Sequence, residues 1–370
     1  MLFLTTSSGL GGMSRIVFSL VRQFAARGWA VRNVFPDDTR SPALLEWARE
    51  QAVPAESSPA VRDIVGAHSF ADMRALRQLI VDCKPDVINL HYGENYISLK
   101  DLIAVRLAGR HRCVVTVYHP TPWSDMNPRK RTMTRLAAYL AHTIVAISNA
   151  TRDVLREAGV PARKIQVIPC GLRVPDTLPP RLEARARLGL SPDAFVISSV
   201  GRLVSHKGFA DLIEATARMS DPQRQLKLVI AGDGPERDAL RGLAAERLGE
   251  RAVLLGHIAE EAIADVYAAG DVFALPSYVE GFGLVYVEAA FYGTPSIGAK
   301  VGGVPDVIAA GETGLLVTPG DIDALATAIE RLRNNVALRQ SLGAAARARA
   351  NAEFTEERMA ERYATIFGIR

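Results

Sequence analysis

The feature that most constrains the fold of this chain is the alternation of short apolar runs with longer amphipathic ones, which continues over 370 residues. Short runs rich in Val, Ile and Leu favour buried strands, and the amphipathic stretches between them favour helices. Repetition of this unit predicts parallel sheets covered by helices, the doubly wound α/β architecture. In the first half we expect strands near Leu2–Thr5, Ala30–Val34, Val87–Leu90, Val114–Tyr118, Thr143–Ile147 and Ile165–Ile168.

The pattern is interrupted near the middle of the chain and then restarts. From Pro169 to Pro192 there are five prolines and only one short helix-like segment, Leu182–Leu188. We interpret this proline-stiffened stretch as an ordered connection between two domains, the number expected for a chain of this length. The second set of strands is expected near Phe195–Val200, Leu226–Ala231, Val253–Leu255, Asp271–Leu275, Thr294–Ile297 and Gly314–Val317.

Composition excludes several classes of protein. With 48% hydrophobic and 23% charged residues the chain is typical of globular domains. No apolar stretch approaches the roughly 18–20 residues that span a bilayer, and the N-terminus lacks the basic start of a signal peptide. We therefore expect a cytoplasmic location. The cysteines Cys83, Cys113 and Cys170 are scattered and lack CxxC spacing, so neither a disulfide framework nor a zinc site is expected.

The net charge of +4 is distributed unevenly along the chain. Residues 1–170 hold 22 Lys+Arg against 14 Asp+Glu, a balance of +8, and the remainder holds 22 against 26, a balance of −4. A basic N-terminal half suggests an anionic partner, such as a phospholipid surface or a phosphate-bearing acceptor. Nucleic acid is not expected, because no aromatic–basic pattern accompanies the charge.

One basic cluster of this half precedes an apolar stretch, Leu136–Leu140. Such a segment suits peripheral contact with a membrane interface, and it suits a solvated helix face equally well. The cluster consists of Arg129, Lys130, Arg131 and Arg135.

Two glutamates eight positions apart, Glu280 and Glu288, frame a glycine-rich loop. The run Val272–Leu275 predicts a strand before the loop, and Leu284–Phe291 predicts a helix after it. The glycines between the glutamates expose backbone N–H groups at the start of that helix, which favours binding of an anion. A phosphate flanked by two carboxylates suits a ligand that is part phosphate and part polyol, as a sugar nucleotide is.

A second loop carries two cations, Arg202 and Lys207. The strand expected at Phe195–Val200 ends just before it, and a helix is expected from near Phe209. An arginine fork grips two phosphate oxygens and a lysine adds a mobile point charge, so the pair suits a diphosphate. By itself the motif is also compatible with a solvated basic loop.

These two motifs and four further segments resemble the retaining glycosyltransferases of the GT-B fold, in particular glycosyltransferase family 4. The further segments are Ala231–Glu236, Leu255–Ile258, Gly302–Ile308 and Gly311–Val317. The resemblance implies two Rossmann-like domains that face each other across a cleft. Residues 1–170 would form the N-terminal acceptor-side domain and residues 171–353 the nucleotide-sugar-binding domain, with the last helix, within 354–370, packed back on the first domain.

By this resemblance, the second half of the chain binds the donor. Glu280 would hold hydroxyl groups of the transferred sugar, and Glu288 the ribose diol. Arg202 and Lys207 would stabilise the leaving diphosphate. The remaining donor-binding positions that the resemblance implies are Gly232, Gly256, His257, Ile258, Gly281, Phe282, Gly283 and Leu284.

A glycine loop, Gly9–Ser14, follows the first strand and opens a helix. It nearly fits the dinucleotide-binding pattern GxGxxG, with Ser14 in place of the last glycine, so an NAD-dependent oxidoreductase is one alternative. The resemblance implies instead that Gly11 and Gly12 lie over the diphosphate and sugar of the donor.

Three polar residues near strand ends of the first half are further candidates. By resemblance, His119 would contact the transferred sugar, although Pro120 follows it where the family often has aspartate. On the acceptor side we expect His91, in a loop after the preceding strand, and Asn149, beside the helix cap that Ser148 predicts.

The resemblance implies transfer of a sugar from a nucleoside diphosphate, with UDP favoured, to an acceptor hydroxyl with retention at the anomeric carbon. The family mechanism is a front-face transfer in which the leaving phosphate helps to deprotonate the acceptor, and no residue of this chain presents itself as a nucleophile. We expect neither a cofactor nor a metal ion, and the acceptor would be a glycan or a lipid-linked sugar. A sugar-nucleotide epimerase or a sensor without turnover are alternatives on the same fold.

Overall fold

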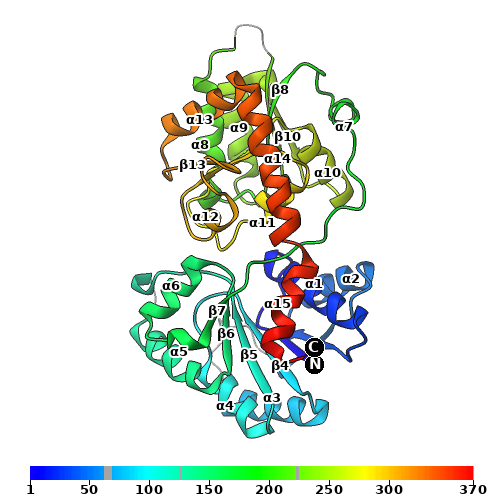
Figure 1. The fold of residues 1–370 in the computed structure, drawn as a ribbon, viewed down its shortest axis with the longest axis vertical. Coiled ribbons are helices and arrows are strands. Elements are labelled where there is room, and N and C mark those ends of the chain that lie inside the picture. Colours follow the sequence, from blue (N-terminus) through cyan, green and yellow to red (C-terminus); the bar gives the residue numbers. More distant parts are fainter. Residues whose placement is uncertain (62–68, 126, 222–224, 370) are drawn as a thin grey trace. The chain divides into compact units, whose positions relative to one another are not determined.

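The computed structural model describes residues 1–61, 69–125, 127–221 and 225–369, and it divides the chain into two compact units (Figure 1). Unit 1 comprises Met1–Arg173 and Glu353–Arg370, and unit 2 comprises Val174–Ala352. The chain therefore passes from unit 1 to unit 2 after Arg173 and returns to unit 1 at Glu353.

Within the described residues, unit 1 is built on a seven-stranded parallel sheet with the order β3-β2-β1-β4-β5-β6-β7. The order reverses between β1 and β4, as the doubly wound prediction requires. The strands are β1 Leu2–Thr5, β2 Arg32–Pro36, β3 Glu56–Ser58, β4 Val87–Tyr92, β5 Arg112–Val117, β6 Thr143–Ala146 and β7 Ile165–Val167. The α-helices are α1 Gly12–Ala26, α2 Ser41–Glu50, α3 Phe70–Cys83, α4 Leu99–Ala108, α5 Pro128–Leu140, α6 Asn149–Glu157 and α15 Glu356–Phe367, and the 3-10 turns are η1 Trp123–Asp125 and η2 Ala162–Lys164.

The strands of unit 1 follow the predicted apolar runs with small shifts at their ends, except for β3. This strand consists of one glutamate and two serines, all half-buried, and it pairs with Val34–Pro36 at the edge of the sheet. An edge strand needs only backbone hydrogen bonds and one covered face. No apolar run therefore marks β3 in the sequence, and our strand prediction missed it.

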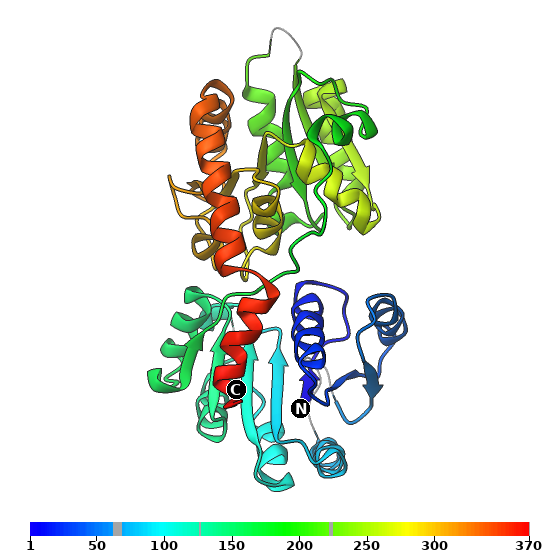
Figure 2. The same cartoon turned by 45° about the vertical axis from the view of Figure 1, so that its right-hand side comes forward.

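The last helix, α15, packs on unit 1 against α1 and β5 although it follows unit 2 in the sequence (Figures 1 and 2). The rings of Phe367 and Phe24 lie 5.3 Å apart, and Arg22 donates to Glu356 at 2.9 Å. Apolar packing and this ion pair hold the end of the chain on the first sheet.

Unit 2 has a six-stranded parallel sheet with the order β10-β9-β8-β11-β12-β13 over its described residues. The strands are β8 Phe195–Val200, β9 Leu226–Ala231, β10 Ala252–Gly256, β11 Val272–Leu275, β12 Ser296–Ala299 and β13 Gly314–Val317. The α-helices are α7 Arg181–Arg187, α8 Phe209–Arg218, α9 Arg237–Leu248, α10 Glu260–Ala269, α11 Leu284–Phe291, α12 Val304–Val307, α13 Ile322–Asn334 and α14 Val336–Glu353, with 3-10 turns η3 Ser205–Lys207 and η4 Gly249–Arg251.

The proline-rich stretch that we interpreted as the domain connection is largely a part of unit 2. From Val174 onward it belongs to that unit, and its helix α7 packs against α10. Arg185 of α7 is 5% exposed and reaches Asp271 at 2.7 Å. The buried ion pair explains why the stretch docks on unit 2, which the proline pattern does not predict.

Candidate active site

The order of the unit 2 strands reverses between β8 and β11, and two of the predicted residues meet there. Ligands of open α/β sheets bind outside the carboxyl ends of the strands at such a reversal. Lys207, in the loop after β8, donates to the Glu280 carboxylate, in the loop after β11, at 2.6 Å. Their side chains are 19% and 13% exposed. The contact is a partly buried ion pair that an entering ligand can still reach.

Arg202 lies on the same loop as Lys207, and its side chain is exposed. Among the residues that the structure describes, it has no ion-pair partner. The backbone around it is fixed, because Leu203 N donates to Asp233 O at 2.9 Å and Glu236 N donates to Leu203 O at 3.0 Å. A cation with a free guanidinium on a rigid loop suits a phosphate ligand.

A close backbone approach joins the loops after β8, β9 and β10. Gly232 has φ +146, and a Cβ at this position would lie 1.8 Å from the carbonyl oxygen of Gly201. Gly232 N donates to Gly256 O at 2.9 Å. Only glycine permits this approach at Gly232, and the hydrogen bond brings the backbones of Gly232 and Gly256 together. After them, His257 is exposed and Ile258 is half-buried.

The loop after β12 holds the backbone of Glu280. Gly303 N donates to Glu280 O at 3.2 Å, and Gly302 has φ +48 with its hypothetical Cβ only 1.8 Å from that oxygen. In the loop after β11, which contains Glu280, Tyr278 N donates to His206 O of the loop after β8 at 2.8 Å. The carboxylate of Glu280 is therefore presented by a backbone that is held from two neighbouring loops.

Helix α11 begins at Leu284, as the apolar run predicted, with Gly283 as its N-cap at φ 98. No side chain caps this end, and the first N–H groups of any α-helix lack intrahelical acceptors. Gly281 is half-buried and Phe282 buried beside it. The helix dipole and these N–H groups make the end of α11 favourable for a phosphate.

Glu288 lies in the second turn of α11, and the structure adds a partner that the sequence reasoning missed. The Tyr267 hydroxyl donates to its carboxylate at 2.5 Å, and the Tyr267 ring is 2% exposed. Tyr267 belongs to α10, 21 residues earlier, where the pattern marks it only as a core position. This hydrogen bond from a neutral hydroxyl orients the carboxylate of Glu288.

His206 is a second residue of this site that the sequence reasoning did not single out. It is exposed and precedes Lys207. Partial burial lowers its pKa from the usual value, and the charge of Lys207 lowers it further. The imidazole is thus neutral at physiological pH and free to donate or accept one hydrogen bond.

The predicted glycines of unit 1 are accessible. Gly11 and Gly12 are exposed at the start of α1, and a Cβ at Gly11 would meet open space. Ser14, in place of the third glycine of the dinucleotide pattern, is buried and donates to Gly9 O at 2.6 Å. The loop therefore has an open backbone surface toward solvent at Gly11 and Gly12.

His119 follows β5 and is half-buried, with its Nδ1 3.2 Å from the Thr121 hydroxyl. Ser148 caps α6 as predicted, since its hydroxyl accepts Thr151 N at 3.2 Å. Asn149 is exposed as the first residue of that helix, and its amide oxygen accepts Arg152 Nη1 at 2.6 Å.

The predicted loop position of His91 is wrong. The residue lies within β4 and its side chain is 0% exposed. Its Nδ1 lies 2.9 Å from the Tyr118 hydroxyl, its ring stacks on Phe3 at 5.7 Å, and burial lowers its pKa to about 3. The buried, neutral ring is a part of the core in this structure and does not reach a surface where an acceptor could bind.

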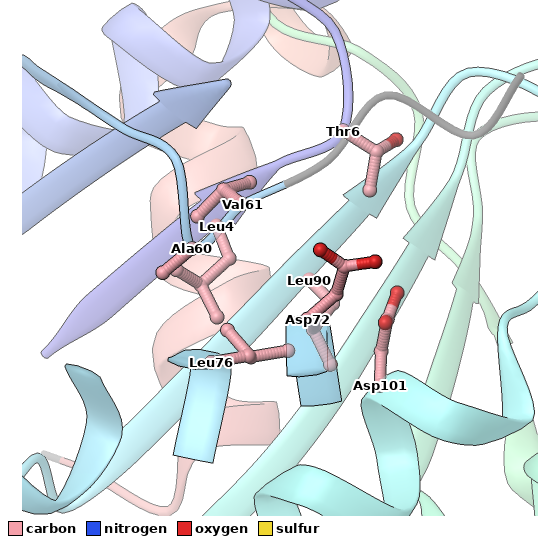
Figure 3. A pocket seen from close by; sticks show the side chains of 8 residues that line it. All are labelled: Leu4, Thr6, Ala60, Val61, Asp72, Leu76, Leu90 and Asp101. Carbon is pink, nitrogen blue, oxygen red and sulfur yellow. The ribbon is translucent and has the colours of Figure 1, made fainter. Parts of the chain in front are cut away.

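A small pocket of unit 1 contains two carboxylates but has no room for a sugar (Figure 3). Its volume is about 10 Å³, the space of one water molecule. Asp72 caps α3 through Ser69, and Asp101 accepts the Tyr92 hydroxyl at 3.0 Å. Both carboxylates therefore have structural roles.

Neither a cluster of metal ligands nor a membrane-spanning helix occurs in the described residues. Groups of three or more His, Cys, Asp and Glu side chains placed to share a metal ion are absent from those residues. None of the helices within the same ranges combines the length and the hydropathy needed to cross a membrane.

Two family descriptions match the chain: Glycosyl transferases group 1 over residues 180–349, and Glycosyltransferase Family 4 over residues 10–174. The chain belongs to glycosyltransferase family 4. The two matches together cover both units. The chain is therefore a glycosyltransferase.

Three similar proteins illustrate the family. The D-inositol 3-phosphate glycosyltransferase of Corynebacterium aurimucosum is 34% identical over 70% of this chain and 66% of its own length. A GDP-mannose-dependent monoacylated alpha-(1-6)-phosphatidylinositol monomannoside mannosyltransferase of Corynebacterium glutamicum is 28% identical over 89% of this chain and 85% of its own. The crystal structure of Anabaena HepE in complex with UDP is 24% identical, covers 99% of each chain and has a TM-score of 0.85. That likeness shows the fold, two Rossmann-like domains of the GT-B type.

Proposed function

We propose that this glycosyltransferase moves a sugar from a nucleoside-diphosphate sugar, with UDP as the preferred carrier, to an acceptor hydroxyl with retention at the anomeric carbon. The observation that carries the proposal is the Lys207–Glu280 pair at the strand reversal of unit 2. A cation for the diphosphate and a carboxylate for sugar hydroxyls lie side by side there, as a sugar phosphate requires. Both UDP and GDP occur among the similar proteins, so the base is the part of the proposal that most needs a test.

The leaving diphosphate gains negative charge as the bond to the sugar breaks. Arg202, Lys207 and the N–H groups at the start of α11 supply fixed positive potential, and electrostatic stabilisation of this kind usually contributes most to enzymatic rate enhancement. We infer that Lys207 exchanges its contact with Glu280 for a phosphate oxygen when the donor binds. Charge stabilisation by these groups requires no metal ion.

Glu280 then accepts hydrogen bonds from hydroxyl groups of the transferred sugar, and Glu288 from the ribose diol. Glu288 can bind both ribose hydroxyls because Tyr267 holds the carboxylate in place. Gly232, Gly256, His257 and Ile258 would line the base pocket. In unit 1, Gly11, Gly12 and His119 would contribute to the donor sugar, with Asn149 on the acceptor side.

A binding screen tests the donor. Thermal unfolding of the intact protein is followed with UDP-, GDP-, ADP- and dTDP-sugars and with NAD, in the presence of a chelator. A ligand at about 100 times its Kd adds about 2.7 kcal/mol of stability. We expect stabilisation by UDP-sugars, lost in the variant Arg202→Ala/Lys207→Ala.

The matched control is Arg218→Ala/Lys227→Ala. It removes the same two residue types at the end of α8 and the start of β9, away from the loops that follow the strands. It should respond to the donor like the wild type. Stabilisation by NAD alone would overturn the proposal in favour of an oxidoreductase. Dependence on an added divalent ion would overturn its metal-independent part.

We propose further that helix α5 places unit 1 on an anionic membrane, which fits a lipid-linked acceptor. Met133, Leu136 and Tyr139 are 38%, 43% and 55% exposed on α5. The four cations of the predicted cluster lie on the same helix. Exposed apolar side chains beside basic ones are typical of helices that lie in a membrane interface.

Sedimentation with vesicles tests the membrane contact. We expect the protein to bind vesicles that contain phosphatidylglycerol and not vesicles of phosphatidylcholine alone, and Met133→Ser/Leu136→Ser should abolish binding. Leu182→Ser, at an apolar residue of unit 2 that is 63% exposed, is the control and should leave binding unchanged. Equal binding to both lipids, or none to either, would contradict the contact.

A further inference from the structure

Three arginines converge on one carboxylate at the amino ends of the unit 2 strands, whereas the donor loops follow the carboxyl ends. Asp271 immediately precedes β11 and its side chain is 8% exposed. It receives Arg181 Nη2 at 2.5 Å and Arg185 Nη2 at 2.7 Å, and Arg339 Nη2 lies 3.7 Å from it. Three guanidinium groups share one carboxylate, so the cluster keeps a surplus of two positive charges.

The three arginines differ in how many of their donors are used. Arg185 is buried, and its Nε and Nη1 donate hydrogen bonds to backbone carbonyl groups, which anchors α7. Arg339 Nη1 donates hydrogen bonds to two backbone carbonyl groups at the end of α13. Arg181 is 44% exposed and uses Nη2 alone, for Gly270 O and Asp271. Its Nε and Nη1 make no hydrogen bond to the part of the chain that the structure describes.

A cavity of about 250 Å³ opens beside this cluster. Sites for drug-sized ligands measure about 300–1,000 Å³, so the cavity suits a smaller molecule. Gly270 and Asp271 line one part of it, directly before β11, and Thr294 and Pro295 line another, directly before β12. Polar groups dominate the wall, which includes Arg181, Arg339, Gln340, Thr294 and Tyr292.

The charges around the cavity favour an anion. Burial lowers the pKa of Arg181 below its usual value, and the charges of Arg185 and Arg339 add to this against the opposing effect of Asp271. An anion placed beside Arg181 relieves this repulsion. Burial raises the pKa of Tyr292, a residue of the cavity wall, and two nearby carboxylates, Glu288 and Asp265, raise it further. Both carboxylates have other partners. Asp265 pairs with Arg187 at 2.6 Å, and Glu288 accepts Tyr267.

We propose that this cavity binds a small phosphate-bearing anion, held by the free donors of Arg181 with Arg339 beside it. Each of these free N–H groups can donate a charge-assisted hydrogen bond to a phosphate oxygen, and the positive charge of Arg339 adds to the attraction. The site is distinct from the donor loops, because these follow the carboxyl ends of the strands whereas the cavity lies at the amino ends of β11 and β12.

Isothermal titration calorimetry tests the site on the intact chain that carries Arg202→Ala/Lys207→Ala, so that phosphate binding at the donor loops is removed. Inorganic phosphate, pyrophosphate and glucose 6-phosphate are titrated at constant ionic strength, with glucose as the uncharged control. We expect saturable binding of at least one phosphate compound and none of glucose. A higher affinity for glucose 6-phosphate than for phosphate identifies a sugar phosphate as the ligand class.

Arg181→Gln should weaken this binding about tenfold or more, the size expected for loss of a charge-assisted hydrogen bond. Arg187→Gln is the matched control. It lies on the same helix, is 49% exposed and is paired with Asp265, and it should change the Kd less than about twofold. If Arg181→Gln proves unfolded by circular dichroism, Arg181→Lys is measured instead, and weaker binding is expected because lysine lacks the Nε and Nη1 donors of the guanidinium.

Absence of saturable binding at millimolar phosphate compounds would overturn the proposal. Equal effects of the substitutions at Arg181 and Arg187 would overturn it too. Since the donor loops are already disabled in this background, either result leaves the proposed donor site untouched.

Discussion

The two units share a strand order but use the point where it reverses in opposite ways. In unit 2, the loops after β8 and β11 bring Lys207 and Glu280 into a partly exposed ion pair. In unit 1, β1 and β4 meet at the same topological point, and there His91 is 0% exposed, stacked on Phe3. One reversal forms a charged site that a ligand can reach, and the other is filled by a neutral ring.

Strand order therefore fixes where a site can form, and the side chains at the strand ends determine whether a ligand can bind there. In unit 2, hydrogen bonds between neighbouring loops hold the charged groups, such as Gly232 N to Gly256 O and Gly303 N to Glu280 O. In unit 1, His91 is buried at this point, whereas the glycine loop at Gly11, which follows β1, and much of the basic helix α5 are exposed. We therefore propose that unit 2 binds the nucleotide and phosphates of the donor, and that unit 1 supplies the acceptor-side surface and the contacts of Gly11, Gly12 and His119 with the donor sugar.

The largest expected effect is at Glu280. Glu280→Gln removes the charge that pairs with Lys207 and weakens the proposed contacts with sugar hydroxyls. We expect kcat/KM for transfer to fall by about 10²–10³, or about 3–4 kcal/mol of transition-state binding. Glu312→Gln, at an exposed glutamate of the same unit, should remain within about twofold of the wild type. Steady-state kinetics with the donor found in the screen measure both variants. An unchanged rate for Glu280→Gln would break the assignment of donor chemistry to unit 2.

Two glycine variants test whether the backbone of the loop after β12 positions Glu280. Gly302→Ala and Gly311→Ala both put an alanine at positive φ, +48 and +79, at a cost of about 1–2 kcal/mol each. Only at Gly302 does the new Cβ meet the Glu280 carbonyl, at 1.8 Å, whereas Gly311 faces open space. We expect about tenfold weaker donor binding by calorimetry for Gly302→Ala and no change for Gly311→Ala. Equal donor affinities of the two variants would show that the loop after β12 does not position Glu280.

The buried histidine of unit 1 predicts a pH dependence of stability. Burial lowers the pKa of His91 to about 3 from a usual 6.5. As the pH falls, His91 is therefore protonated in the unfolded state before it is protonated in the folded state. The stabilising contribution is present above pH 6.5 and is lost progressively as the pH falls toward 3, by about 2 kcal/mol between pH 7 and pH 5. His91→Phe should remove this slope.

All three tryptophans, Trp29, Trp47 and Trp123, lie in unit 1. Tryptophan fluorescence during urea unfolding therefore reports the stability of that unit. Identical pH slopes in the wild type and in His91→Phe would contradict the buried, neutral state of the ring.

The smallest effect is expected at Tyr267. Tyr267→Phe removes the hydroxyl that holds Glu288. We expect donor affinity to fall about three- to tenfold, which corresponds to the free energy that one hydrogen bond contributes. Tyr292→Phe is the control, because its ring stacks on Tyr267 at 5.6 Å but its hydroxyl does not hold Glu288. A larger loss with Tyr292→Phe than with Tyr267→Phe would mean that ring packing, and not the hydrogen bond, supports the site.

Most of the fold could be predicted from the sequence because buried parallel strands are continuous apolar runs. The strand at Phe195–Val200 and the helix at Leu284–Phe291 have the predicted bounds. Strand β3 could not be predicted, since Glu56–Ser58 contains no apolar residue. His91 was misplaced because Tyr92, the next residue, continues β4 with its side chain fully buried.

The site could be predicted in part. The short motifs marked Arg202, Lys207, Glu280 and Glu288, and the structure brings two of these residues, Lys207 and Glu280, into contact. Tyr267 was missed because its contact with Glu288 joins two helices and depends on how they pack. The arginine cluster at Asp271 was missed for the same reason, since its members come from α7 and α14, which lie far apart in the sequence.

Whether Lys207 holds the diphosphate of the donor can be measured by comparing a nucleoside diphosphate with its nucleoside, on the wild type and on Lys207→Ala. UDP and uridine, or GDP and guanosine if the screen selects that base, are titrated by calorimetry against the wild type and Lys207→Ala. We predict that Lys207→Ala weakens binding of the diphosphate about tenfold or more and leaves binding of the nucleoside unchanged. Equal losses for both ligands, or no loss for either, would contradict the claim.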